Sequence, residues 1–500
     1  MSLLGIDIGI SGCKAVAFDL EGRPLSQAYR EYRLYQPQPG WMELEPAEVW
    51  AAVRDAICQV TASCGDPVRS LAISTHGESV VPVDAAGRSL YRFITAIDTR
   101  AAEQARRWEE QPGRERVFAV TGMPLHPMYT ANKLMWLREF DPATFHAAHR
   151  FLCMADFLYA QLGLPPAMSH SLASRTMLQD VHTLGWSAEM MAYAGLQPTQ
   201  FSPALPSATV LGEVPSQVAE DLGLAPGALG VIGGHDQCCG ALGIGGIREG
   251  IVMDSTGTVE CVAAAMPRLV LDRRLLDGNL PVEPHTAPGM YIVLGWSSVG
   301  GALLRWYRDT FAAEERIEAA RMGRDAYDII LSQAAAGPSP VLILPHFVGS
   351  GTPWLDPASK GAILGLDLST TRGQIIKGIL DSVTYEIKLS IDTMEAAGIA
   401  VQELRAMGGG ARSSLWLQTK ADIIGKPVRA MDVAEAPCLG CAILAGVALG
   451  EYASIPEAVA QMVRINRTYE PDLVLHACYA EKAALYKEIY PTLAPLNHRM

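Results

Sequence analysis

The sequence predicts an α/β protein built from two related domains, and three observations lead to this expectation. The chain has 500 residues, enough for two to four domains at roughly 100–200 residues each. Short apolar runs typical of strands alternate with longer segments of helical spacing. A pattern of apolar strand, Asp, polar glycine loop and second apolar strand occurs at 5–19 and again at 248–265. We therefore expect an internal duplication into domains at 1–246 and 247–500, with a cleft between them.

The N-terminal half opens with a predicted run of hairpins. Apolar or alternating segments separated by short polar turns predict strands in this region, at 3–9, 15–20, 25–34, 68–76 and 79–84. Helical spacing of apolar residues predicts helices at 47–60, 101–111 and 131–140. In the first of these helices, Val49, Val53, Ile57 and Val60 fall on one face, so that face should be buried.

The C-terminal half repeats this alternation. Strands are expected at both ends of 248–265 and around 403–407, with a helix at 415–424. The Ala- and Gly-rich run at 436–450 is uncharged but shorter than the roughly 18 residues of a membrane span. It is interpreted as a buried helix.

Composition excludes several classes of protein. There are 40 Lys and Arg against 53 Asp and Glu, a formal charge of −13, so the basic surface that binds nucleic acid or anionic lipid is not expected. The N-terminus lacks the basic region of a signal peptide, and the 10 cysteines are scattered. Free thiols in a cytoplasmic enzyme are the expectation. For the Cys438-x-x-Cys441 pair, packing is the expected role, and metal or redox use is the less favoured alternative.

The first polar loop has the residues that a phosphate site needs. Glycines such as Gly9 let backbone N–H groups approach an anion, Ser11 can donate from its hydroxyl, and Lys14 supplies positive charge. Asp7, at the end of the strand, could hold Mg²⁺. The alternative interpretation is a tight hairpin turn with no ligand.

A second set of loops in the C-terminal half has the same character. Thr256, Gly257 and Thr258 form the repeated loop, and two such loops can clamp a polyphosphate from both domains. Glycine-rich junctions also precede two predicted helices, where backbone donors gather at a positive helix end. Their candidate nucleotide-binding residues are Gly301, Gly409, Gly410 and Ser413. A tight crossover without a ligand is the alternative.

Asp236 is the candidate catalytic residue. It follows the apolar run 229–232 and two glycines and precedes an Ala- and Gly-rich segment. A carboxylate at such a strand-to-helix turn can accept a proton from a hydroxyl that attacks phosphorus. Helix N-capping is the alternative for Asp236, and His235 is interpreted as a positioning or packing residue.

Two long patterns show that the chain resembles the FGGY family of carbohydrate kinases over essentially its whole length. The segment 128–139, MYTANKLMWLRE, fits the first family signature, which is broken only at Phe140. The segment 361–366 with 374–381 fits the second, except that Gly378 stands where Ala or Ser is usual. Lys133 and Trp136 look like structural members of the first signature.

The resemblance implies an actin-like fold, in which two ribonuclease H-like domains flank a central nucleotide cleft. It also implies ATP and Mg²⁺ as cofactors and Asp236 as the catalytic base. Asp7, Ser11 and Lys14 match the family's first phosphate loop and the region where metal binds. The remaining nucleotide positions match Thr256, Gly257, Thr258, Gly301, Gly409 and Ser413. Many members of the family dimerise, so a homodimer is one expectation of the resemblance.

The resemblance also suggests where a sugar would bind. The segment Ser74 to Glu78, STHGE, resembles the part of the family that contacts substrate hydroxyls, and it is similar to the xylulokinase pattern except that Thr75 replaces Met. This makes Thr75, His76 and Glu78 candidate substrate residues, together with Asp98 and Asp236. Ala96 stands where the family usually has Trp, which should reshape the pocket. For Glu78 and Asp98 an ordinary surface pair is the alternative.

The sequence therefore predicts an ATP-dependent kinase acting on a terminal hydroxyl of a small sugar, with a pentulose such as xylulose as first choice. Fuculose, ribulose, erythritol and glycerol are alternative substrates. An actin-like nucleotide switch that binds a protein partner is the alternative from another functional class. It would need neither the carboxylate of Asp236 nor a segment that faces a sugar.

Overall fold

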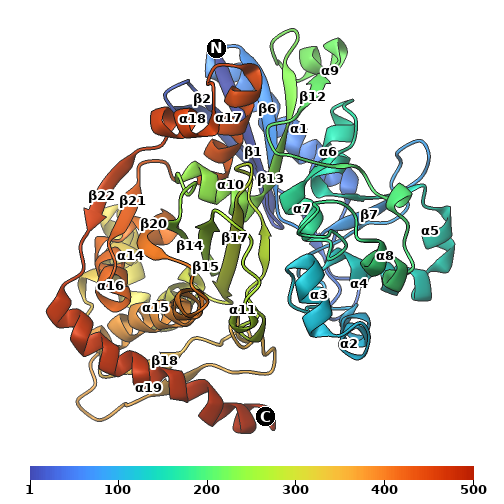
Figure 1. Ribbon diagram of the computed structural model, residues 1–500. Helices are drawn as coiled ribbons and strands as arrows, with labels where there is room; N and C mark the ends of the chain where they lie inside the picture. Colours follow the sequence, from blue (N-terminus) through green and yellow to red (C-terminus); the bar gives the residue numbers. More distant parts are fainter.

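The computed structural model describes all 500 residues. Two lobes are visible in Figure 1, each built around a mixed β-sheet with helices on its faces. The two sheets come from the two halves of the chain, as the sequence predicts. Each predicted strand and helix named above is present, and α1 buries the valine and isoleucine face that its spacing indicated.

The N-terminal lobe contains a six-stranded sheet in the order β12-β13-β6-β1-β2-β3. Its strands are β1 (Ser2–Ile8), β2 (Gly12–Phe18), β3 (Pro24–Glu31), β6 (Val68–Thr75), β12 (Val210–Glu213) and β13 (Leu229–His235). The first strand is apolar on both faces, with Leu3, Leu4, Ile6 and Ile8 fully buried, as expected for a central strand covered on both sides.

The C-terminal lobe contains a seven-stranded sheet in the order β16-β17-β15-β14-β20-β21-β22. Its strands are β14 (Gly250–Thr256), β15 (Glu260–Met266), β16 (Val282–Pro284), β17 (Tyr291–Ser297), β20 (Val401–Gly408), β21 (Val428–Met431) and β22 (Ile465–Tyr469).

The two sheets share a five-stranded arrangement, in which β3 pairs antiparallel with β2 in the first sheet and β17 with β15 in the second. In the first, β1 pairs antiparallel with β2 and parallel with β6, and β6 pairs parallel with β13. In the second, β14 pairs antiparallel with β15 and parallel with β20, and β20 pairs parallel with β21. The glycine loops at 9–11 and 257–259 thus lie at equivalent hairpins of the two sheets.

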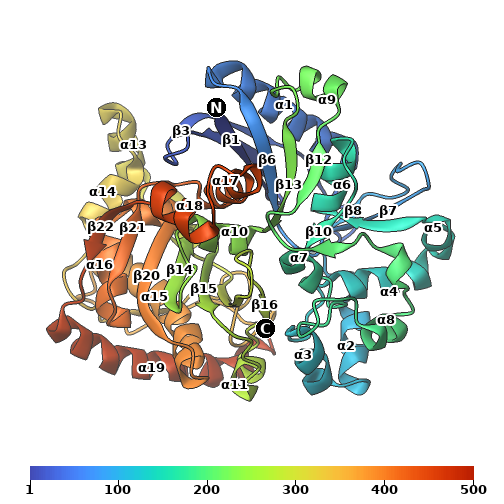
Figure 2. The same cartoon turned by 45° about the horizontal axis from the view of Figure 1, so that its top comes forward.

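The last core helix of each half packs against the sheet of the other half. Helix α17 (Ala436–Leu449), the predicted buried helix, shares a hydrophobic cluster with β1, β2 and β6 of the N-terminal sheet (Figure 2). Helix α10 (Asp236–Gly243) contributes to this cluster through Cys239 and Leu242, and its other side packs with β14, β15 and β20 of the C-terminal sheet. The two helices also contact each other through glycines: a Cβ at Gly440 would overlap the carbonyl of Cys239, and one at Gly243 would overlap that of Ala436. The halves are therefore joined by a reciprocal exchange of helices.

The N-terminal lobe carries a large insertion between β6 and β12. Its strands β7 (Val80–Val83), β8 (Phe93–Ile94) and β9 (Arg150–Cys153) form a five-stranded sheet, in the order β4-β5-β8-β7-β9, with β4 (Leu34–Tyr35) and β5 (Glu43–Leu44), which precede β6 in the chain. Two short two-stranded sheets complete the strands: β10 (Met168–Ser169) with β11 (Ala204–Leu205), and β18 (Leu342–Leu344) with β19 (Ala362–Leu364).

Helices cover the sheets of both lobes. Those of the N-terminal half are α1 (Pro46–Cys64), α2 (Ala102–Glu110), α3 (Arg114–Thr121), α4 (Thr130–Phe140), α5 (Pro142–Ala147), α6 (Met154–Gln161), α7 (His170–Ser174), α8 (Ala188–Ala194) and α9 (Ser216–Asp221). Those of the C-terminal half, besides α17, are α11 (Arg273–Asp277), α12 (Gly301–Phe311), α13 (Ala313–Met322), α14 (Ala326–Ser332), α15 (Arg372–Ala396), α16 (Ser414–Ile424), α18 (Ile455–Met462) and α19 (Leu473–Asn497). None of these helices has both the length and the apolar character required to span a bilayer.

Candidate active site

Asp236 lies where β13 ends and α10 begins. The strand continues through both glycines to His235, further than the apolar run alone indicated. Glycine is needed at Gly233, because this residue lies against the backbone of Ile73 where no Cβ would fit. Asp236 is the first residue of the helix, but the helix has no side-chain cap. The N-capping alternative is therefore wrong. The Asp236 side chain is 25% exposed, so a substrate can reach it.

The contacts of the Asp236 carboxylate leave one oxygen free. The Gln237 Nε2 donates to Oδ1 at 3.2 Å, and the His235 Nε2 lies 3.2 Å from the same oxygen. No group of the chain hydrogen-bonds Oδ2. A carboxylate held by one oxygen with the other unpartnered is arranged to accept a proton.

Asp7 lies on β1, just before the first loop. That loop is a tight hairpin, in which the Gly9 N–H donates to the Gly12 carbonyl at 2.9 Å. The Asp7 Oδ1 accepts from the Ser74 hydroxyl at 2.8 Å. Burial, and after it the negative charge of Asp236, raises the pKa of Asp7 to about 7. The loop therefore holds more negative charge than its neighbours neutralise.

The other residues of the first loop remain accessible to a ligand. Ser11 is exposed and Gly9 is half-buried. The Lys14 Nζ forms an ion pair with Glu435 at 2.6 Å, and its side chain is 29% exposed. Because Glu435 immediately precedes α17, this pair links the first loop to the C-terminal half.

The second loop and the glycine-rich junctions lie together. The Gly301 N–H donates to the Gly257 carbonyl and the Gly300 N–H to the Thr258 carbonyl, both at 2.8 Å. Gly410 lies against the Thr256 side chain with no room for a Cβ. Gly257, Thr258 and Gly409 are exposed. The structure thus brings these predicted nucleotide-binding residues to one place.

Two predicted nucleotide residues use their hydroxyls within the protein. Thr256 is buried, and its hydroxyl contacts Glu260 at 2.9 Å and the Lys420 Nζ at 2.7 Å. Ser413 caps α16, with its Oγ accepting from the Trp416 N–H at 3.2 Å. A nucleotide could contact these two positions through other atoms, but neither hydroxyl stands free.

The STHGE segment lies at the end of β6, next to β1 and β13. His76 is buried, donates to the Ile8 carbonyl through Nδ1 at 3.0 Å and contacts the Ser79 hydroxyl through Nε2 at 2.6 Å. Burial lowers its pKa, so it is a neutral hydrogen-bonding residue at pH 7. Thr75 is also buried, and its hydroxyl has no partner.

Glu78 and Asp98 are buried rather than on the surface, so the surface-pair alternative is wrong. The Glu78 Oε1 accepts from the Arg175 Nε at 2.6 Å, whereas Oε2 has no hydrogen bond within the chain. Asp98 accepts from Arg100 and, at 2.6 Å, from the Met42 N–H. Asp98 therefore has both oxygens occupied, and Glu78 has one oxygen available to a substrate hydroxyl.

The first signature supports Glu78 structurally. Glu78 has a φ of 66°, an uncommon backbone conformation for a residue with a side chain. Its carbonyl accepts from the Lys133 Nζ and the Thr130 hydroxyl, both at 3.0 Å. Lys133 is fully buried. This arrangement explains why a lysine and a threonine stand three residues apart on α4.

Two family models match almost the whole chain. The N-terminal domain of the FGGY family of carbohydrate kinases matches residues 2–243, and the C-terminal domain of the same family matches 252–449. The chain belongs to the FGGY family of carbohydrate kinases. Its members are ATP-dependent phosphotransferases, and the predicted family, fold and enzyme class are thereby confirmed.

Individual relatives of this FGGY kinase carry different substrate names. A xylulose kinase of Staphylococcus epidermidis is 28% identical, covering 98% of this chain and 96% of its own. A glycerol kinase of Methylibium petroleiphilum is 30% identical and covers 99% of both chains. Among solved structures, the xylulose kinase of Rhodospirillum rubrum superposes with a TM-score of 0.88 at 26% identity over the full length of both chains. That of Lactobacillus acidophilus gives 0.90 at 21% identity, covering 99% of this chain and 98% of its own.

Sequence reasoning missed three buried charged residues of this FGGY kinase. Arg175 bridges Glu78 and Glu283, Glu283 also contacts His235 at 2.6 Å, and Lys420 lies under the second loop. None of the three belongs to a recognisable motif, and each reaches the site from an element distant in sequence. The contact of Gln237 with Asp236 could have been predicted, because Gln237 directly follows the catalytic candidate in the sequence.

All ten cysteines are free. The Sγ atoms of Cys239 and Cys441 lie 3.9 Å apart where α10 crosses α17, and both side chains are fully buried. Burial raises the pKa of the Cys441 and Cys438 thiols well above the usual range. Such thiols are poor nucleophiles, which agrees with a packing role.

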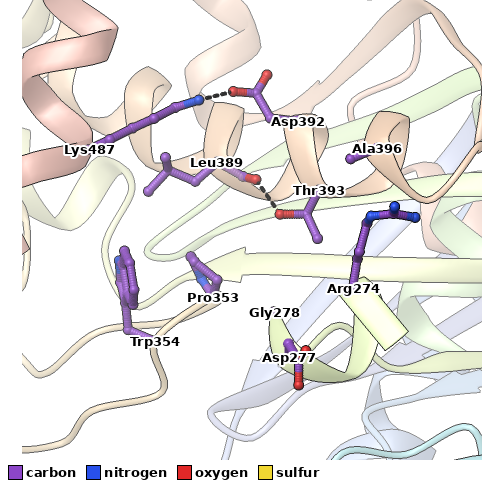
Figure 3. A pocket seen from close by; sticks show the side chains of 10 residues that line it. All are labelled: Arg274, Asp277, Gly278, Pro353, Trp354, Leu389, Asp392, Thr393, Ala396 and Lys487. Carbon is purple, nitrogen blue, oxygen red and sulfur yellow. Dashed lines mark hydrogen bonds and ion pairs between the residues drawn. The ribbon is translucent and has the colours of Figure 1, made fainter. Parts of the chain in front are cut away.

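A cavity of about 420 Å³ opens in the C-terminal half between α11, α15 and α19 (Figure 3). No predicted site residue lines it. Its charged side chains are paired with neighbours, as in the Lys487–Asp392 contact of 2.8 Å. The cavity therefore offers no unpaired charge to an anionic or cationic ligand.

Proposed function

We propose that this kinase transfers the γ-phosphoryl group of ATP to a terminal hydroxyl of a small ketose, with a pentulose such as xylulose as the first choice. Asp236 is the catalytic base. The observation that carries this proposal is the Asp236 carboxylate, which is partly exposed, held through Oδ1 and unpartnered at Oδ2.

In the proposed reaction the substrate hydroxyl gives its proton to the Asp236 Oδ2 while its oxygen bonds to the γ-phosphorus. The bond from that phosphorus to the β–γ bridging oxygen breaks, and ADP leaves with this oxygen. Little covalent chemistry falls to the protein in phosphoryl transfer, so positioning and charge neutralisation provide most of the rate.

The nucleotide is assigned to the loops of both halves. Gly9, Ser11 and Lys14 would hold its phosphates from the N-terminal side, and Gly257 and Thr258 from the C-terminal side. Thr256, Gly301, Gly409, Gly410 and Ser413 are proposed to line the same nucleotide.

Mg²⁺ fits the residues around Asp7. Burial, and after it the negative charges of Asp236 and Glu435, raises the pKa of that carboxyl, and a hard cation with oxygen ligands would offset this negative charge. When bound, the ion would neutralise charge on the phosphates. Asp7 is the residue proposed to hold it.

The sugar is assigned to the STHGE side of the site. Glu78 can accept a hydroxyl through its free Oε2, and His76 lies beside it as a neutral group. Thr75 and Asp98 would act through the shape of the pocket, because one is enclosed and the other fully paired. Xylulose is favoured because relatives and solved structures named xylulose kinase recur, as in Staphylococcus epidermidis and Rhodospirillum rubrum.

Other substrates stay in competition because similarly distant relatives are named otherwise. A glycerol kinase and a gluconokinase match at 30% and 28% identity, so fuculose, ribulose, erythritol, glycerol and gluconate belong in the same test.

We also propose a cytoplasmic location, supported by the ten free cysteines.

The test is ADP release measured with purified protein, ATP and Mg²⁺ against a panel of ketoses, aldoses, polyols and aldonates. We expect one ketose to raise turnover steeply. Asp236→Asn should lower kcat by about 10²–10⁴-fold and leave ATP affinity nearly unchanged, whereas Asp309→Asn, at the exposed end of α12, should match the parent. Turnover indifferent to every sugar would instead support the nucleotide switch, and equal rates for Asp236→Asn and parent would remove Asp236 from the mechanism.

A further inference from the structure

We propose that Glu283 is a positioning residue that the C-terminal half supplies to the catalytic base of the N-terminal half, by holding His235 against the Asp236 carboxylate. The inference rests on the proposed role of Asp236 and adds to it the residues that orient this base. It concerns a contact between β13 and β16, which belong to different sheets.

Glu283 is fully buried, and its oxygens are occupied by donors from the N-terminal half. Oε1 lies 2.6 Å from the His235 Nδ1 and 3.0 Å from the Cys238 Sγ, and Oε2 lies 3.3 Å from the Arg175 Nη1. A buried carboxylate without partners costs several kcal/mol. These three groups are the partners that stabilise the buried charge of Glu283. The pairing with Glu283 also fixes a proton on the His235 Nδ1.

The opposite side of the imidazole faces the base. The His235 Nε2 lies 3.2 Å from the Asp236 Oδ1. The charged and titratable groups around the ring are Glu283 from β16, Asp236 and Cys238 from α10, and Arg175 from the end of α7. Burial opposes a charged imidazole, but the two carboxylates outweigh it and raise the pKa of His235.

The His235 ring in this position determines which oxygen of Asp236 reacts. A carboxylate can turn about its last torsion and exchange its two oxygens. The His235 Nε2 and the Gln237 amide both lie at Oδ1, so Oδ2 is kept toward the accessible side. The arrangement resembles the logic of a triad, in which one carboxylate orients an imidazole that serves the reacting group. Here the reacting group is the second carboxylate.

Arg175 connects the same carboxylate to the sugar side. It lies between Glu283 and Glu78, so Glu283 contacts both the group that holds the base and the group that holds a candidate substrate residue. The base is consequently oriented only when β16 lies against the N-terminal lobe as it does here.

Binding a metal ion is the alternative role for His235, Cys238 and Glu283, because their ligand atoms lie within 4.8 Å of one another. Two ligands about 2.0–2.1 Å from a tetrahedral ion stand roughly 3.3 Å apart. The 2.6 Å between His235 and Glu283 is instead a hydrogen-bond distance, and the guanidinium on Glu283 would repel a cation. A hydrogen-bonded network is the better account.

The test uses the full-length kinase and its best sugar. Glu283→Gln keeps the shape and removes the charge, and we expect kcat to fall about 10- to 100-fold, as for a hydrogen bond to a charged group, with the KM for ATP within about twofold. His235→Asn keeps a donor toward Glu283 and loses the contact with Asp236, so it should fold and lose kcat by a similar factor. The double variant should be no worse than His235→Asn, because both changes break one unit.

The matched control is Glu386→Gln. Glu386 is also a buried carboxylate paired with a histidine, His346 at 2.9 Å, but it lies in the C-terminal core. It should lower stability and leave kcat unchanged. Histidine ¹³Cε1 NMR adds a readout independent of turnover: the His235 signal should titrate at lower pH in Glu283→Gln than in the parent, and at parent pH in Glu386→Gln.

Unchanged kcat in His235→Asn, multiplying losses in the double variant, or an unshifted His235 titration would each overturn the inference. Asp236→Asn separates this result from the proposed function. If Asp236→Asn abolishes turnover while Glu283→Gln and His235→Asn keep the parent kcat, the base stands and the positioning role of Glu283 is wrong. If Asp236→Asn is active, the proposed function itself fails.

Discussion

Replacing Lys420 by Met should strongly destabilise the C-terminal half and loosen the second loop. Lys420 lies on α16 with its side chain 1% exposed, and its Nζ lies 2.6 Å from the Asp254 Oδ2 and 2.7 Å from the Thr256 hydroxyl. It also forms an ion pair with Glu260. Asp254 and Thr256 end β14, so this one ammonium group supports the strand that carries the loop.

The expected magnitude follows from the charges in this cluster. Burial, aided by the nearby Asp254, raises the pKa of Glu260 well above its usual range despite the opposing Lys420. Burial thus favours the neutral form of Glu260, which leaves Asp254 as the carboxylate that depends most on the ammonium group of Lys420. Removing the ammonium leaves Asp254 as an unpaired buried charge, which costs about 3–5 kcal/mol. At about 2–4 °C per kcal/mol for a domain of this size, the Tm should fall by about 6–20 °C.

Thermal unfolding of Lys420→Met and two double variants tests this charge count. Adding Asp254→Asn should restore most of the lost Tm, because it removes the unpaired charge. Adding Glu260→Gln should restore less, because burial already favours the neutral form of that side chain. A Tm within about 2 °C of the parent for Lys420→Met, or a better rescue by Glu260→Gln than by Asp254→Asn, would refute the reasoning.

Two further predictions concern stability. Burial raises the pKa of Asp156 from 3.8 to about 7. The folded state is therefore destabilised as pH rises from about 4 to 7, by roughly 4 kcal/mol in total. Asp156→Asn should have a higher Tm than the parent at pH 8 but not at pH 4, and an equal difference at both pH values would contradict this. Gly440→Ala should lose about 1–3 kcal/mol of stability or more by overpacking, because its Cβ would overlap the Cys239 carbonyl. Denaturant titration checks this against Gly185→Ala, whose Cβ would make only an ordinary contact. Equal stability of the two variants would count against the close crossing.

The features that the sequence predicts well are local in the chain. The hairpin loops at 9–11 and 257–259, and Asp236 at a strand-to-helix junction, depend on apolar runs and glycines within a few residues. Buried valines of α1 follow from a single helical period. These signals need no knowledge of the tertiary structure, so composition and spacing were enough.

What the sequence could not give depends on long-range packing. Glu283 meets His235 across 48 positions and Lys420 meets Asp254 across 166, and no periodicity encodes such a pairing. The surface-pair alternative for Glu78 and Asp98 fails for the same reason, because their cationic partners decide whether a carboxylate is buried. The run at 436–450 indicated burial, but only the fold reveals that it covers the opposite sheet.

That exchange of helices matters for how the polypeptide emerges during synthesis. The apolar face of the first sheet is completed by α17, about 200 residues downstream of α10. At about 5–20 residues per second, the nascent chain would wait some 10–40 s with Leu3, Val16 and Ala72 uncovered. The apolar face of the N-terminal sheet thus stays incompletely covered for that interval, until α17 has been made.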